Sequence, residues 1–237
     1  MARRLYQKGF AFWLLALGFW LLASQNANCQ QLSANSSNWR DSLTVLAKAI
    51  NSNPQSVDLR LRKAAVNIEL SQWDYAIEEY GRVLQIEPRN LTARYFRAYA
   101  NEQLRRYESA KADYEANLRQ VPKNIEAMLG LAMIYRKMGN MVEALDALNQ
   151  LVQFFPDSAY AYAARAGLEV ELKQYDVAVY DWDEAIRLDS TNMEFRVSKV
   201  DVLLAMNKKN EARTLLDDII RGGVPRVALR EWLERCK

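Results

Sequence analysis

The sequence predicts an all-α protein built from repeated pairs of helices. Glycine and proline are scarce, with 8 and 5 residues in a chain of 237, while half of the residues are apolar. This composition favours helices over strands joined by tight turns. Proline also recurs at a fixed interval of 34 residues, and small residues recur between the prolines at the same interval. Such self-similarity is typical of stacked repeats, in which each repeat buries its apolar face against its neighbours.

Three series of residues carry the interval. Four of the five prolines occupy equivalent positions, namely Pro54, Pro88, Pro122 and Pro156. Alanine forms two series: Ala64, Ala98, Ala132 and Ala166, and then Ala76, Ala110, Ala144, Ala178 and Ala212. A further series holds large side chains: Tyr80, Tyr114, Leu148, Trp182 and Leu216. Because the distance between packed helices depends on the side chains at their contact, we expect the alanines to mark close, buried contacts.

The starts of the helices follow the same interval. A serine or asparagine stands two residues after each proline position, namely Ser56, Asn90, Asn124, Ser158 and Asn192. These residue types are good N-caps, because their side chains accept a hydrogen bond from a backbone N–H of the first turn. In the second repeat we expect a first helix (helix A) from Asn90 to Leu104. A second helix (helix B) should run from Glu108 to Gln120, where Pro122 ends it.

The interval, the small residues at the helix contacts and the proline at the exit resemble the tetratricopeptide repeat (TPR) family. The resemblance implies a right-handed α-solenoid of five helix-turn-helix repeats: 57–90, 91–124, 125–158, 159–192 and 193–224. The sequence departs from the family pattern at Val224, which replaces the last proline, and in the turn between helices A and B, where only Gly139 keeps the usual glycine. Helices at 39–54 and 225–237 are expected to cap the stack, since an end repeat has only one neighbour.

Charged residues also recur. A base of helix A is followed sixteen residues later by an acid of helix B in three repeats, giving the pairs Lys63 and Glu79, Arg97 and Asp113, and Arg165 and Asp181. We predict that each pair forms an ion pair between the two helices of one repeat. In the third repeat Leu131 and Ala147 take these positions and should make an apolar contact. The alternative interpretation is a basic stripe that binds an acidic ligand.

The family resemblance also implies a function. In TPR proteins the A helices line a concave groove that binds protein segments. By position, six candidate contact residues fall on this lining: Tyr95, Phe96, Tyr99, Leu129, Met133 and Tyr160. Tyrosine suits such a surface, because it offers a broad contact area with a polar tip. The sequence therefore predicts a non-catalytic scaffold that binds a peptide or protein partner, and packing between repeats is the alternative role for the aromatic residues.

Composition argues against several other functions. The absence of histidine excludes histidine-based catalysis and most zinc sites. The formal charge of +3 is supplied by Arg3, Arg4 and Lys8, so the rest of the chain lacks the net basic charge of a nucleic-acid-binding domain. We therefore expect no enzyme activity, no cofactor, no metal and no nucleic-acid partner. A self-associating structural subunit and a hydrolase based on a carboxylate pair stay open as alternatives.

The N-terminus has the pattern of a secretory signal peptide. A basic start over residues 1–8 is followed by an apolar run over 10–23 and by small and polar residues before Cys29. A helix of this apolar run would span about 21 Å, less than the roughly 30 Å of a bilayer core. We expect cleavage after Cys29, a flexible linker over 30–38, and a periplasmic or secreted protein in a cell-envelope assembly. A lipid attached to Cys29 and an uncleaved membrane anchor are the alternatives.

Overall fold

The computed structural model describes residues 36–237 and confirms the all-α prediction, since this part of the chain contains helices and no strand. In chain order the helices are α2 (Ser36–Ser52), α3 (Val57–Glu69), α4 (Trp73–Ile86), α5 (Leu91–Gln103), α6 (Tyr107–Gln120), α7 (Ile125–Met138), α8 (Met141–Phe154), α9 (Ala159–Glu171), α10 (Tyr175–Leu188), α11 (Met193–Ala205), α12 (Lys209–Arg221), the 3₁₀ helix η2 (Arg226–Leu229) and α13 (Arg230–Arg235). None of these helices is both long and apolar enough to cross a membrane.

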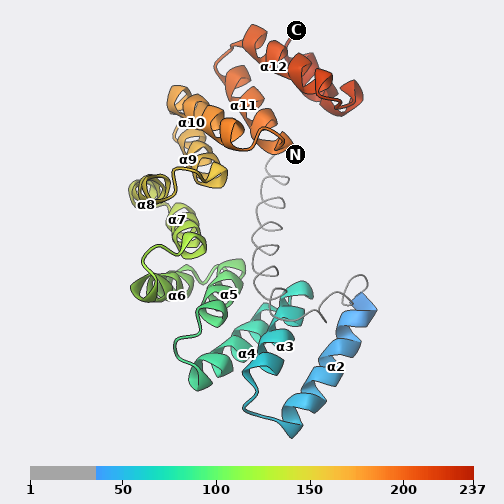
Figure 1. The fold of residues 1–237 in the computed structure, drawn as a ribbon, viewed down its shortest axis with the longest axis vertical. Coiled ribbons are helices and arrows are strands. Elements are labelled where there is room, and N and C mark those ends of the chain that lie inside the picture. The colour runs from blue at the N-terminus through green and yellow to red at the C-terminus, as the bar shows by residue number, and fades with distance from the viewer. Residues whose placement is uncertain (1–35) are drawn as a thin grey trace. The chain divides into compact units, whose positions relative to one another are not determined.

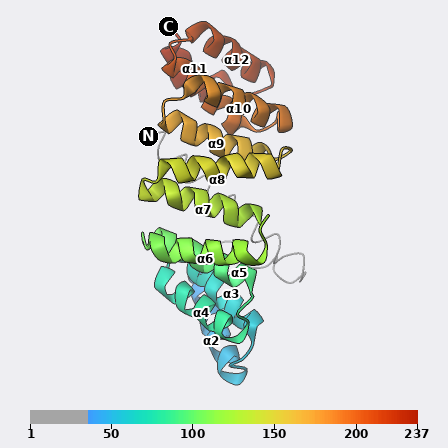
Figure 2. The same cartoon turned by 90° about the vertical axis from the view of Figure 1, so that its left-hand side faces the viewer.

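The helices form two compact units, of which the first ends at Gly130 and the second begins at Leu131. In unit 1, α2 packs on α3, α3 on α4, α4 on α5 and α5 on α6 (Figure 1). In unit 2, α8 packs on α9, α9 on α10, α10 on α11 and α11 on α12 (Figure 2). Within each of these two series, successive helices therefore pack on one another, which is the arrangement of stacked helical hairpins.

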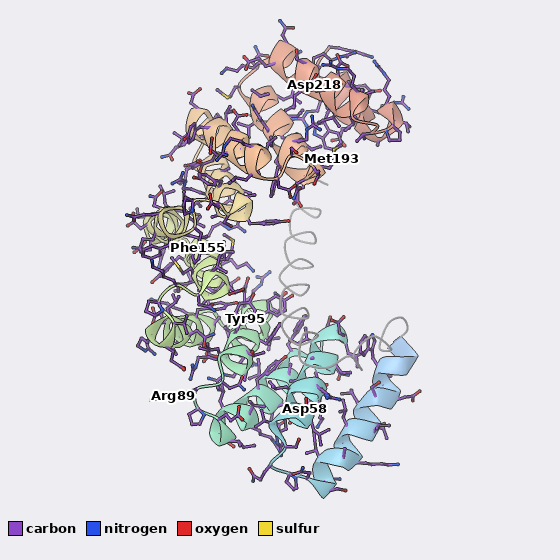
Figure 3. The ribbon with its side chains drawn as sticks, viewed as in Figure 1. Asp58, Arg89, Tyr95, Phe155, Met193 and Asp218 are labelled. Carbon is purple, nitrogen blue, oxygen red and sulfur yellow. The ribbon has the colours of Figure 1, made fainter. Side chains whose placement is uncertain are left out.

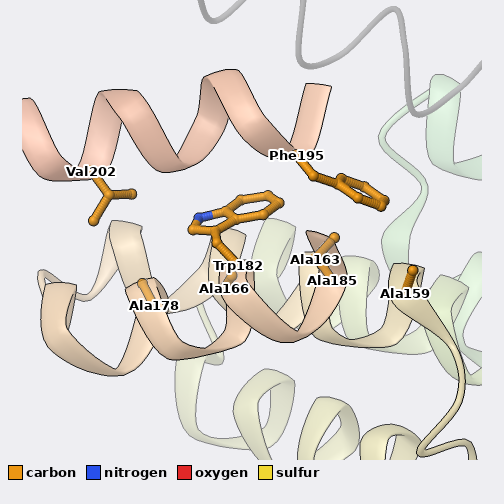
Figure 4. Close-up of a cluster of buried hydrophobic side chains, with 8 residues drawn as sticks. All are labelled: Ala159, Ala163, Ala166, Ala178, Trp182, Ala185, Phe195 and Val202. Atoms are coloured by element: carbon orange, nitrogen blue, oxygen red, sulfur yellow. The ribbon is translucent and has the colours of Figure 1, made fainter. Parts of the chain in front are cut away.

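The two alanine series lie at the helix contacts, as predicted. All nine residues have an exposed fraction of 0%: Ala64, Ala98, Ala132, Ala166, Ala76, Ala110, Ala144, Ala178 and Ala212. A cluster in unit 2 shows the arrangement (Figure 4). Trp182 of α10, one of the large residues of the periodic series, lies between Phe195 and Val202 of α11, while Ala166 and Ala178 allow α9 and α10 to approach. Small and large side chains thus alternate in the core.

The predicted N-caps are confirmed. The side chains of Ser56, Asn90, Asn124, Ser158 and Asn192 each accept a hydrogen bond from the backbone nitrogen three residues later, at distances from 2.7 to 3.4 Å. In the second repeat the observed helices, α5 and α6, lie within one residue of the predicted bounds. The caps therefore fix where each helix A begins.

The turn between helices A and B keeps one geometry without a conserved residue type. The residues at this position all have positive φ, from 55° to 85°: Ser71, Arg105, Gly139, Lys173 and Asn207. The residue that follows donates its N–H to a carbonyl five positions back, as from Gln72 to Asn67 at 2.8 Å. This is the Schellman arrangement, which favours glycine because other side chains are strained at positive φ. Ser71, Arg105 and Lys173 therefore adopt it at a local cost, whereas asparagine tolerates positive φ.

The ends differ from their predicted bounds. Helix α2 begins at Ser36, so residues 36–38 are helical and do not belong to the linker predicted over 30–38. The helix predicted over 225–237 is divided into η2 and the short helix α13. Leu229 and Leu233 are both buried against α11 and α12, and the break at Leu229 places both in this apolar cluster. The predicted signal peptide, residues 1–29 with Cys29, lies outside the described residues.

Candidate interaction surface

Four of the six predicted groove residues are buried in unit 1. Tyr95, Phe96 and Tyr99 of α5 have exposed fractions of 8, 6 and 7%, and Leu129 of α7 has 3%. Figure 3 marks Tyr95 on α5. In this structure the four side chains are packing residues of unit 1 and do not form an open lining.

Aromatic contacts explain this burial. Tyr80 of α4 stacks on Phe96, with ring centroids 5.9 Å apart. Tyr95 meets the ring of Phe96 edge-on at 5.2 Å and that of Tyr114 of α6 at 5.7 Å. Such pairs contribute about 0.5–1.5 kcal/mol each beyond the area that they bury. The aromatic rings therefore join α4, α5 and α6.

A glycine completes this packing. A Cβ added to Gly130 of α7 would lie 2.5 Å from two ring carbons of Tyr114, so the ring rests against bare backbone. In the preceding repeat the equivalent position holds Phe96, on which Tyr80 stacks. Sequence reasoning missed the packing of Tyr114 on Gly130. The signal that could have found it is a glycine at a position that holds phenylalanine in the preceding repeat.

Burial and nearby carboxylates raise the pKa of both tyrosines, Tyr95 and Tyr99. Burial raises the pKa of Tyr95 well above its ordinary value, and the carboxylates of Glu102 and Glu126 add to the rise. Burial, with Glu102 and Glu69 adding, raises the pKa of Tyr99 to about 12. The Tyr95 hydroxyl has no hydrogen-bond partner among the described residues. These acids come from three successive A helices, α3, α5 and α7, so carboxylates of all three lie near the neutral tyrosines of α5.

The two remaining groove residues belong to unit 2. Met133 of α7 and Tyr160 of α9 are both half-buried. The Tyr160 hydroxyl accepts a hydrogen bond from Nδ2 of Asn192 at 3.4 Å, and its ring meets Phe195 edge-on at 5.3 Å. Burial raises the pKa of Tyr160, and Asp189 and Glu194 add to the rise. Tyr160 therefore joins α9 to α11 and keeps part of its ring accessible.

Two of the predicted ion pairs are bidentate and have buried acids. Arg97 donates from Nε and Nη2 to the carboxylate of Asp113, at 2.8 and 2.6 Å. Arg165 donates in the same way to Asp181, at 2.6 and 2.8 Å. The acid side chains are only 8 and 0% exposed. Removing one partner of a buried pair costs about 3–5 kcal/mol, whereas an exposed pair contributes about 1 kcal/mol or less. These pairs therefore belong to the framework of each hairpin.

The third predicted pair has an additional member. Lys63 donates from Nζ to Glu79 at 2.8 Å, and Arg60 donates to the other carboxylate oxygen at 2.9 Å. Sequence reasoning did not include Arg60, which precedes Lys63 by one helical turn and so lies on the same face of α3. Glu79 therefore binds two bases.

A second buried acid lies beside the pair in unit 2. Glu169 of α9 is 3% exposed, and its Oε2 has no hydrogen-bond partner among the described residues. Burial raises its pKa to about 7, with Asp181 adding to the rise and Arg165 opposing it. This carboxyl group is therefore partly protonated near neutral pH.

The stacked hairpins and their A-helix surface define a repeat protein of the class that serves as protein-interaction scaffolds. Two family models described as tetratricopeptide repeat match the chain, one at residues 68–125 and the other at 102–168. Residues 68–168 of the chain therefore belong to the tetratricopeptide repeat family.

Solved structures share this fold. A tetratricopeptide repeat protein from Parabacteroides merdae has a TM-score of 0.64 and 21% identity, covering 94% of this chain and 82% of its own. PilF of Pseudomonas aeruginosa has a TM-score of 0.64 and 16% identity, and the match covers 89% of this chain and 90% of the PilF chain. YrrB, described as a TPR protein with an unusual peptide-binding site, has a TM-score of 0.53 and 18% identity. The match covers 74% of this chain and 91% of the YrrB chain. A comparison with curated proteins gave no match.

Proposed function

We propose that the chain is a non-catalytic scaffold that binds a basic segment of another protein on the A-helix face of unit 1. The observation that carries the proposal is the set of three carboxylates, Glu69, Glu102 and Glu126, whose charges act on Tyr95 and Tyr99. They come from three successive A helices, so an extended segment can meet them one after another.

Lysine or arginine side chains suit the three carboxylates, because opposite charge steers a partner to the surface and fixes its register. The segment would therefore combine basic residues with apolar ones that cover the rims of the aromatic rings. TPR proteins of known structure include YrrB, which is described as having a peptide-binding site, and this likeness supports the same type of ligand.

The location is part of the proposal. The basic start and short apolar run of residues 1–23 support export to the periplasm or beyond, within a cell-envelope assembly. A lipid on Cys29 or a retained N-terminal anchor would instead hold the chain at a membrane. Mass spectrometry of the protein isolated from cells distinguishes the three forms by the mass of the N-terminal peptide.

The binding proposal is tested with matched fluorescent peptides that share apolar residues and carry either lysines or glutamates. We expect only the lysine peptides to bind, with an affinity that falls as salt is added. The double variant Glu69→Gln/Glu126→Gln should weaken binding about fivefold, since two partly exposed charges contribute about 0.5 kcal/mol each.

The matched control is Glu108→Gln, which removes an exposed acid in the first turn of helix B, α6. It should leave the affinity unchanged. Equal binding of the glutamate peptides, or an equal loss in the control, would refute the proposal. Absence of peptide binding together with a mass that rises with protein concentration would favour the self-associating subunit.

A further inference from the structure

A pocket of about 400 Å³ lies between α2, α3 and α4 of unit 1. Its volume is within the range of small-molecule sites. One wall is apolar and consists of Leu43, Ala47 and Ile50 of α2, and the opposite wall includes Arg60, Lys63 and Asn67 of α3. The pocket therefore offers an apolar side and a polar, cationic side to one ligand.

The polar wall carries an unbalanced positive charge. Arg60 and Lys63 both bind the one carboxylate of Glu79, whose side chain is 6% exposed. Arg60 directs its other donors to the carbonyl oxygen of Pro54, at 3.0 and 2.8 Å. Lys63 has three donors and is 27% exposed, so its ammonium group can bind a second acceptor. The remaining charged residues on the pocket wall, Glu78 and Arg82, bind each other.

Asn67 supplies a second, independent indication of a ligand. It is 2% exposed, and its Nδ2 has no hydrogen-bond partner among the described residues. A buried amide without a partner is costly, because it has lost its hydrogen bonds to water. In the next repeat the equivalent Asn101 donates to the carbonyl oxygen of Arg97 at 3.0 Å. Of the two asparagines at this position of the repeat, only Asn67 therefore keeps a free donor, and it lies one turn after Lys63.

We propose that this pocket binds a small organic monocarboxylate with an apolar tail. The ammonium of Lys63 and the amide of Asn67 hold the carboxylate, and the apolar wall of α2 covers the tail. A single negative charge matches the single excess positive charge of the wall. This site is separate from the peptide surface of the proposed function, which lies on the acids near Tyr95 and Tyr99.

The test uses the whole chain and octanoate as the probe, with isothermal titration calorimetry and backbone NMR. Octan-1-ol and octylammonium have the same tail without the negative charge. We expect octanoate to bind one per chain, octan-1-ol to bind at least about tenfold more weakly, and octylammonium not to bind. Signals of Leu43, Ile50 and Asn67 should shift. Octanoate should not compete with a basic peptide, so failure of either proposal is seen separately.

Asn67→Leu is the decisive variant, because it removes the unpaired donor and keeps a similar volume. It should fold at least as stably as the parent chain and bind octanoate about tenfold more weakly. Asn101→Leu is the matched control and should keep full affinity. The proposal is overturned if octan-1-ol binds as tightly as octanoate, if Asn67→Leu keeps its affinity, or if octanoate does not bind. The ligand series decides the question even where a variant fails to fold.

Discussion

Replacement of Gly130 by alanine tests the packing of unit 1 at its tightest point. The new Cβ would lie 2.5 Å from Cε1 and Cζ of Tyr114 and 2.9 Å from Cε2. Tyr114 is 1% exposed and contacts Tyr95, so its ring has no free space to enter. Overpacking of this kind costs about 1–3 kcal/mol. Alanine regains about 1 kcal/mol over glycine within a helix. We expect a net loss of up to about 2 kcal/mol of stability.

Gly81→Ala is the matched control. Gly81 also lies within a helix, α4, but the nearest atom to an added Cβ is Nη1 of Arg97 at 4.0 Å. Helix propensity alone then applies, and the variant should gain about 0.5–1 kcal/mol. Urea unfolding followed by circular dichroism measures both variants, with the midpoint compared at an unchanged m value. Equal stabilisation by the two substitutions would refute the packing of Tyr114 on Gly130.

A second substitution should rescue the first. The next repeat has Leu148 at the position of Tyr114 and Ala164 at the position of Gly130. The double variant Gly130→Ala/Tyr114→Leu reproduces this combination in unit 1. We expect it to be more stable than the sum of the two single changes predicts, because the smaller side chain removes the clash.

Three further predictions concern single contacts. A double-mutant cycle on Arg97 and Asp113 should give a coupling above about 1 kcal/mol in urea unfolding, and zero coupling would count against the buried pair. The pKa of Glu169 rises from 4.5 to about 7 on folding, so the folded chain binds more protons in this range and stability falls as pH rises through it. Glu169→Gln should remove roughly 1–3 kcal/mol of that pH dependence between pH 5 and 8, and an unchanged slope would contradict the burial of the acid. Lys173→Gly, at φ 60°, should raise the free energy of unfolding by about 0.5–1 kcal/mol. Asn207→Gly should change it little, since asparagine tolerates positive φ. Equal effects of the two substitutions would contradict the strain at Lys173.

The regular part of the fold is predictable because each repeat solves the same packing problem. Buried alanines and N-caps recur since their roles depend on contacts that every hairpin makes with the next. The turns show the limit of this reasoning. Gly139 and Asn207 suit the left-handed turn by themselves, yet Arg105 and Lys173 adopt it as well. There the packing of the two helices outweighs the local cost of positive φ. The strength of that packing cannot be read from a single sequence.

The candidate surface is less predictable, because an A-helix side chain has two possible environments. Phe96 stacks on a large neighbour, Tyr80, and is buried in the core, whereas Tyr160 keeps part of its ring accessible. The spacing of sixteen residues predicts the ion pairs but not the burial of their acids, which depends on the helices stacked on either side. The pocket near Asn67 depends on α2, a helix outside the repeat pattern.

The central claim is that a basic protein segment binds at Glu69, Glu102 and Glu126 on the A-helix face of unit 1, beside Tyr95 and Tyr99. NMR of the chain with labelled tyrosine rings, titrated with a lysine-containing peptide, tests it most directly. We predict saturable shifts of Tyr95 and Tyr99 and none of Tyr180, an exposed tyrosine of α10. Shifts confined to Tyr180, or no saturable shift at Tyr95 and Tyr99, would contradict the claim.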